Sequence, residues 1–110
     1  MRIELSDEAA ADLAEAEAFI ASDSPRAATA FRERVRSLLE RLATREFEGP
    51  TTLITGIAVQ SWALPPYRIY YLRLTEGLFV VRIYHQALGR ALSSVKREFG
   101  QFNDVEAAKL

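Results

Sequence analysis

One stretch, residues 61–85, constrains the fold of this chain more than any other. It contains two runs rich in β-branched and aromatic residues, 67–74 and 78–85, separated by a short segment that ends at Gly77. Gly77 can take the positive φ that a tight hairpin turn needs. The stretch therefore predicts an antiparallel β-hairpin.

The predicted hairpin has no cleanly polar face. Side chains alternate between the two faces of a strand, which groups Tyr70 with Leu72 in the first run. In the second run the same alternation groups Val80, Arg82 and Tyr84. An antiparallel hairpin usually turns one polar face to water. We therefore interpret one face as core and the face with Tyr70, Leu72, Val80 and Tyr84 as a surface for a partner.

The residues before the hairpin predict a strand, two helices and a further strand. Residues 2–5 alternate between polar and apolar, and Ser6 can cap a first helix. Ser24 can cap a second helix, in which apolar residues recur at helical spacing as far as residue 42. The arginines and glutamates of this second helix are interpreted as solvated surface. Residues 46–56 predict a loop, and residues 57–64 predict the next strand.

This order predicts an α+β fold, β-α-α-β-β-β, with a mostly antiparallel four-stranded sheet covered on one face by a helical hairpin. Residues 1–90 form the predicted domain, and residues 91–110 form a C-terminal tail. Leu92, Val95 and Phe99 have helical spacing, so the tail predicts a short helix over residues 91–99, with a loose end beyond Asn103.

Composition restricts the function. The formal net charge is −1, which disfavours a protein that binds nucleic acid mainly by neutralising phosphates. The sequence contains no cysteine, no apolar run of the roughly 18 to 20 residues that span a bilayer, and no signal-peptide pattern. We therefore expect a cytoplasmic protein with no membrane contact and no direct DNA binding.

Three motifs together resemble the ParE/RelE superfamily of toxins from bacterial toxin–antitoxin modules. They are Ser61-Trp62 before a turn, Tyr67-Arg68-Ile69-x-Tyr71, and a final strand ending in Arg82-x-x-His85. The resemblance covers roughly residues 1–90 and is closest to the ParE, or plasmid-stabilisation, branch. It implies a toxin neutralised by a cognate antitoxin that folds along it, with DNA gyrase as the target. In the RelE branch it would instead imply cleavage of mRNA on the ribosome.

The sequence departs from the family pattern at several positions. Leu72 follows Tyr71 where the family usually has arginine, and the arginine comes one residue later, at Arg73. Leu88 and Gly89 stand where an Arg-Asp pair is usual. A non-toxic relative of the family therefore stays open as a third interpretation.

The candidate catalytic residues, if the chain is RelE-like, are Arg82, Tyr84 and His85. Arginine, tyrosine and histidine can orient a hydroxyl, stabilise a phosphorane and protonate a leaving group. However, Tyr84 and His85 alternate to opposite faces, and His85 is the only histidine, so no histidine-based metal site can form. We expect neither metal nor cofactor, and we favour a toxin that is not an enzyme.

The favoured site is a surface that binds the antitoxin or the target. A homodimer stays open. The residues predicted for this surface are Trp62, Arg68, Tyr70, Leu72, Val80, Arg82, Tyr84 and Arg90.

Overall fold

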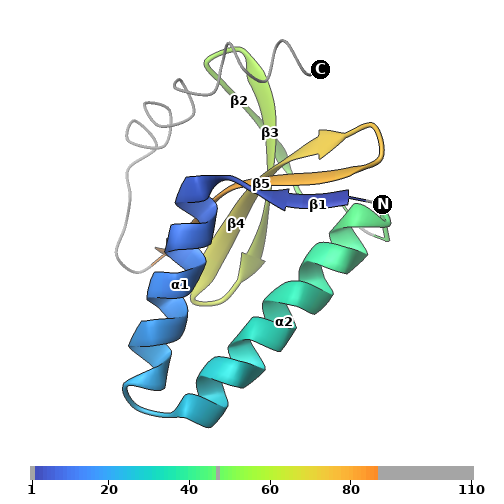
Figure 1. Ribbon diagram of the computed structural model, residues 1–110. Coiled ribbons are helices and arrows are strands. Elements are labelled where there is room, and N and C mark those ends of the chain that lie inside the picture. The colour runs from blue at the N-terminus through green and yellow to red at the C-terminus, as the bar shows by residue number, and fades with distance from the viewer. Residues whose placement is uncertain (1, 47, 87–110) are drawn as a thin grey trace.

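The computed structural model describes residues 2–46 and 48–86 and has an α+β fold. A helical hairpin lies on one face of a five-stranded sheet with strand order β1-β5-β4-β3-β2 (Figure 1). β1 runs parallel to β5, and the other neighbours are antiparallel. The elements are β1 (Arg2–Leu5), α1 (Asp7–Ala21), α2 (Pro25–Ala43), β2 (Thr51–Ile54), β3 (Ile57–Leu64), β4 (Tyr67–Leu74) and β5 (Gly77–His85).

Both predicted helix starts are confirmed. The Ser6 Oγ accepts a hydrogen bond from the amide of Ala9 at 2.9 Å and donates one to the carbonyl of Val81 at 2.7 Å. Ser24 caps α2 in the same way, with Pro25 in the first turn. A capping hydroxyl satisfies one of the amides that the first helical turn leaves unpaired. Ser6 also ties the start of α1 to β5.

The main core lies between the helical hairpin and the sheet. Apolar side chains of α2 recur at i, i+3, i+4 and i+7, as the sequence predicts, and they pack against alternate residues of β4 and against residues 78, 80 and 83 of β5. The fully buried centre contains Val35 and Leu42 from α2, Ile69 and Tyr71 from β4, and Leu78 from β5. The helical hairpin therefore covers one face of the sheet, as predicted.

The prediction of four strands is wrong, because part of the expected loop 46–56 is a fifth strand. β2 pairs antiparallel with β3 through a two-residue turn at Thr55 and Gly56. Both turn residues have positive φ, 50° and 84°, the combination that a tight hairpin with the native twist requires. A β-branched residue rarely takes positive φ, so Thr55 gives little signal of a turn.

A bulge in β5 overturns the predicted grouping of Val80 with Tyr84. Tyr70 pairs with Arg82 but Tyr71 pairs with Val80, which leaves Val81 as an extra residue. Val80 consequently points into the core under the helices and is 0% exposed. On the other face Leu72, Val81 and Tyr84 form a second buried cluster.

The reason proposed for Gly77 is also wrong. The φ of Gly77 is not positive. Among the described glycines, only Gly56 has a positive φ. Gly77 instead begins β5 opposite Arg2, where a Cβ would lie 1.8 Å from the Arg2 carbonyl oxygen. Glycine is needed because the β1 backbone approaches too closely for a side chain. The predicted tail helix, residues 91–99, lies outside the described residues.

Candidate functional site

Arg82, the first candidate catalytic residue, is held by Asp12 of α1. The Nε and Nη2 of Arg82 donate to the two carboxylate oxygens of Asp12 at 2.8 and 2.9 Å, and the amide of Ile83 donates to the same carboxylate at 3.0 Å. β1 pairs with β5 only as far as Val80, so Asp12 supplies an acceptor where the ladder has ended. The side chains of Arg82 and Asp12 are only 8% and 13% exposed.

The Asp12 carboxylate keeps this arginine charged despite its burial. Burial alone lowers the pKa of Arg82, but the hydrogen bonds and negative charge of Asp12 outweigh it, and the pKa lies above the ordinary value. The guanidinium also lies 4.6 Å from the centre of the Tyr84 ring. Arg82 therefore has the environment of a structural ion pair between α1 and β5.

Tyr84 and His85, the other two catalytic candidates, line one small hollow between α1 and the end of β5. Tyr84 is 6% exposed, and its ring packs edge-on against Tyr70 with centroids 5.8 Å apart. The His85 ring packs edge-on against Tyr67 at 5.0 Å. The hollow has a volume of about 260 Å³ and is lined by Asp12, Glu15, Ala16, Phe19, Tyr67, Ile83, Tyr84 and His85.

The wall of this hollow contains acidic side chains. Asp12 and Glu15 contribute carboxylates to its wall. Burial, with a smaller contribution from the charge of Glu15, raises the pKa of Tyr67 above its ordinary value, so its hydroxyl stays protonated. Because Asp12 is paired with Arg82, Glu15 is the acidic side chain of this wall that has no ion pair among the described residues.

The predicted binding residues are only partly brought together: Leu72 and Tyr84 are buried in the second cluster, and Tyr70 packs against it. Arg68 donates to the Ser61 hydroxyl at 2.8 Å, Tyr70 is half-buried, and Leu72 is 2% exposed in the second cluster. Val80 lies in the core on the opposite face. Arg90 lies outside the described residues.

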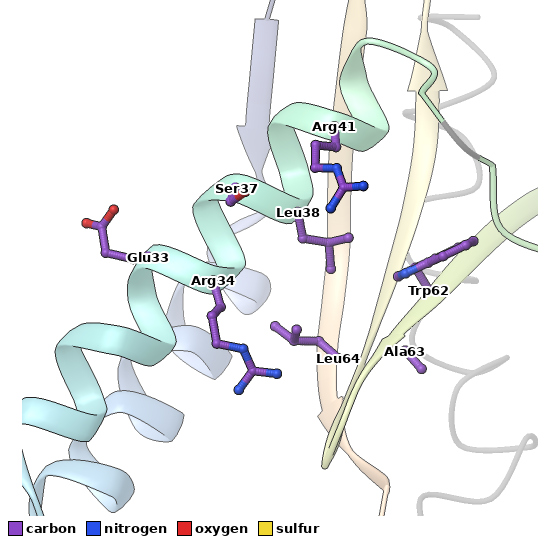
Figure 2. A pocket seen from close by; sticks show the side chains of 8 residues that line it. All are labelled: Glu33, Arg34, Ser37, Leu38, Arg41, Trp62, Ala63 and Leu64. Atoms are coloured by element: carbon purple, nitrogen blue, oxygen red, sulfur yellow. The ribbon is translucent and has the colours of Figure 1, made fainter.

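Trp62, by contrast, lines a larger groove between α2 and β3 (Figure 2). Arg34, Leu38 and Arg41 extend from α2 toward β3, from which Leu64 extends back toward the helix, whereas Glu33 points away. The groove has a volume of about 620 Å³, and its lining consists of Glu33, Arg34, Ser37, Leu38, Arg41, Trp62, Ala63 and Leu64.

The charged rim of this α2/β3 groove is mostly positive. The exposed Arg41 pairs with Glu46, and Glu33 pairs with Arg36 outside the groove. Arg34 is exposed and has no ion pair with any residue in 2–46 or 48–86. The groove therefore offers an apolar floor with an available guanidinium at its edge.

The α2/β3 groove was not predicted from the sequence, because the α2 arginines were all interpreted as solvated surface. The signal that was present is their spacing: Arg34, Leu38 and Arg41 follow i, i+4, i+7 and so share one helix face. The opposite wall of the groove includes Trp62 of β3. Nothing in the sequence near Trp62 indicates that it lies across from this helix face.

In the described parts of the chain, no group of three or more histidine, cysteine or acidic residues is placed to hold a metal ion. None of the helices found there has the length and apolarity to cross a membrane.

Comparison with known proteins identifies the family. Residues 3–87 match the family model described as the ParE toxin of the type II toxin–antitoxin system parDE. The chain belongs to this toxin family. The family implies a toxin of a type II toxin–antitoxin pair, with an antitoxin as its partner. A search of curated proteins gave no match to the chain.

Proposed function

We propose that this ParE-family toxin acts in the cytoplasm by binding a protein target, without cleaving nucleic acid, and that a cognate antitoxin neutralises it by direct contact. DNA gyrase is the target proposed for this activity. Family membership supports the toxin and the antitoxin, and the chemistry of the candidate residues supports the mode of action.

The observation that carries the non-enzymatic mode is the Asp12–Arg82 pair. A catalytic arginine must contact the phosphorane as negative charge develops on it. Arg82 instead directs two donors at a carboxylate while its side chain is 8% exposed. Releasing it would leave a buried, unpaired Asp12, which is costly.

Charge supports the same conclusion. A nuclease that docks on ribosomal RNA needs a strongly basic surface, because phosphate neutralisation supplies much of the binding free energy. This chain has 14 lysines and arginines against 15 acidic residues. Protein contact does not require such an excess of positive charge.

Growth assays test the proposal. The toxin is expressed from an inducible promoter, alone and together with the reading frame that adjoins its gene. We expect growth arrest with the toxin alone, rescue with the neighbour, and inhibition of supercoiling when purified toxin is added to gyrase. Arrest without any effect on gyrase would remove gyrase as the target, and absence of arrest would favour a non-toxic relative.

A ribosome-dependent ribonuclease is the second candidate, because Tyr84 and His85 line one hollow. Purified toxin is incubated with translating ribosomes, and the mRNA is examined by primer extension. We expect intact mRNA. Cleavage at defined codons that is lost in His85→Ala would establish the nuclease and reject the proposed mode of action.

A further inference from the structure

The α2/β3 groove combines an apolar floor with two arginines at its rim. We propose that it binds a helical segment of the antitoxin that carries two carboxylates seven residues apart with a large apolar side chain between them. This inference rests on the proposed function, because it takes the antitoxin as the occupant.

The spacing of the groove residues sets the spacing in the partner. Arg34 and Arg41 are seven residues apart on α2, which corresponds to two helical turns, or about 10.5 Å along the axis. Leu38 lies between them on the same face. A helix lying along α2 meets this face with its own i, i+3 or i+4, and i+7 positions. An extended segment would cover the same distance in about three residues.

The floor of the groove selects an apolar anchor. Leu38 and Leu64 approach each other from opposite walls, and the half-buried Trp62 completes the floor. Tryptophan with a hydrophobic surround is typical of the residues that dominate protein–protein binding. The hollow of about 620 Å³ holds several side chains and is open along one side of α2.

The rim of the groove selects carboxylates. Arg34 lacks an ion pair with any described residue, so it is available to a partner without breaking an internal contact. Arg41 pairs with Glu46, but both side chains are more than half exposed, and exposed pairs contribute little to stability. A partner carboxylate can therefore take the place of Glu46, and the planar guanidinium can bind it with two hydrogen bonds.

A protein fits this groove better than RNA does. A nucleic-acid site combines aromatic stacking with a row of cations that follows the backbone. The α2/β3 groove has one aromatic residue and two arginines. The apolar part of its wall offers nothing to a phosphate. RNA is nevertheless included in the experiment as the alternative ligand.

The experiment uses full-length toxin and the neighbouring reading-frame product that rescues growth. Binding is measured by isothermal titration for wild type, Arg34→Glu, Arg41→Glu and the matched control Arg36→Glu. Arg36 is an exposed arginine of the same helix that pairs with Glu33 and does not line the groove. We expect each groove variant to raise the Kd more than tenfold and Arg36→Glu to change it less than threefold, with unchanged circular dichroism throughout.

A charge swap then tests the spacing. Acidic residues of the antitoxin are replaced by lysine one at a time, and each variant is titrated against Arg34→Glu and Arg41→Glu toxin. We expect one acidic position to restore binding to each toxin variant, the two positions being seven residues apart. Rescue at positions about three residues apart would reject the helix in favour of an extended segment.

The remaining outcomes separate this inference from the proposed function. If the antitoxin binds and rescues growth but all groove variants bind like wild type, the groove is not its site and the inference fails alone. If the product of the adjoining reading frame does not rescue growth, the proposed function fails, and the inference fails with it. A labelled RNA 20-mer is titrated in parallel. If Arg34→Glu abolishes RNA binding but leaves antitoxin binding intact, the groove is a nucleic-acid site and the inference is rejected.

Discussion

The two sides of the helical hairpin place their arginines in opposite situations. On the α1 side Arg82 is buried and directs two donors at Asp12, seventy residues away in the sequence. On the α2 side Arg34 is exposed at the rim of a groove and has no ion pair among the described residues. The guanidinium of the family-motif arginine is therefore directed into an internal ion pair, whereas the arginine on the α2 face is exposed to solvent.

The difference follows from the cost of removing charge from water. A buried guanidinium must have a paired carboxylate and satisfied hydrogen bonds, and Asp12 meets that need. Once it is met, little binding capacity is left for a ligand. An exposed arginine keeps its hydration until a partner displaces the water, so its interactions can be exchanged.

The largest expected effect comes from breaking the α1-side pair. Asp12→Ala leaves the Arg82 guanidinium and the amide of Ile83 without their acceptor in a buried position. Removing one partner of a buried ion pair typically costs about 3–5 kcal/mol. We expect the free energy of unfolding, measured in urea, to fall by about 3–5 kcal/mol.

The double variant Asp12→Leu, Arg82→Met provides the control for this effect. Replacing a buried pair by apolar residues is often neutral or stabilising. It should recover most of the lost stability, with growth arrest retained. Loss of arrest in a stable double variant would return Arg82 to the functional site.

The next effect lies in the α2/β3 groove. Trp62→Ala should weaken antitoxin binding by about 2 kcal/mol, roughly thirtyfold in Kd, as for a central tryptophan in an interface. Titration calorimetry measures it. Ala63 lines the same groove, so Ala63→Ser is the control variant, and we expect it to leave the Kd for the antitoxin nearly unchanged. Equal affinities for wild type and Trp62→Ala would place the antitoxin elsewhere.

A smaller effect concerns association kinetics. Arg34→Gln keeps the length and polarity of the side chain but removes the charge that attracts a carboxylate. Rim charges act mainly on the association rate and its dependence on salt. In stopped-flow measurements the variant should associate about two- to tenfold more slowly at low salt and should converge with wild type as screening increases. A difference independent of salt would contradict electrostatic attraction at Arg34.

The smallest effect is the pH dependence of stability on the α1 side. Burial and Glu15 hold the pKa of Tyr67 above its value of about 10 in the unfolded chain. The unfolded chain therefore loses this proton first. The stabilising contribution is complete below pH 10 and declines as the pH rises through that region. Urea unfolding of Tyr67→Phe between pH 8 and 11 should show a flatter decline than wild type, and parallel curves would contradict it.

The elements of the fold could be predicted wherever short-range chemistry specifies them. Ser6 and Ser24 are caps because a hydroxyl reaches an amide three residues on, and the apolar period of α2 reports its buried face. The central hairpin is likewise evident in the residue types of β4 and β5. The fifth strand was not predicted, because its turn uses Thr55 at positive φ, which the residue type disfavours.

The sequence by itself determined the α+β class, both helix starts, the hairpin and the membership in a toxin family. Each of these depends on residues close together in the chain or on their order along it. Tertiary structure alone decided the bulge that separates Val80 from Tyr84, the pairing of Asp12 with Arg82, and the groove that joins Arg34 to Trp62. These depend on contacts between residues far apart in sequence, and the free energy of such a contact depends on burial and neighbours that only the folded chain creates.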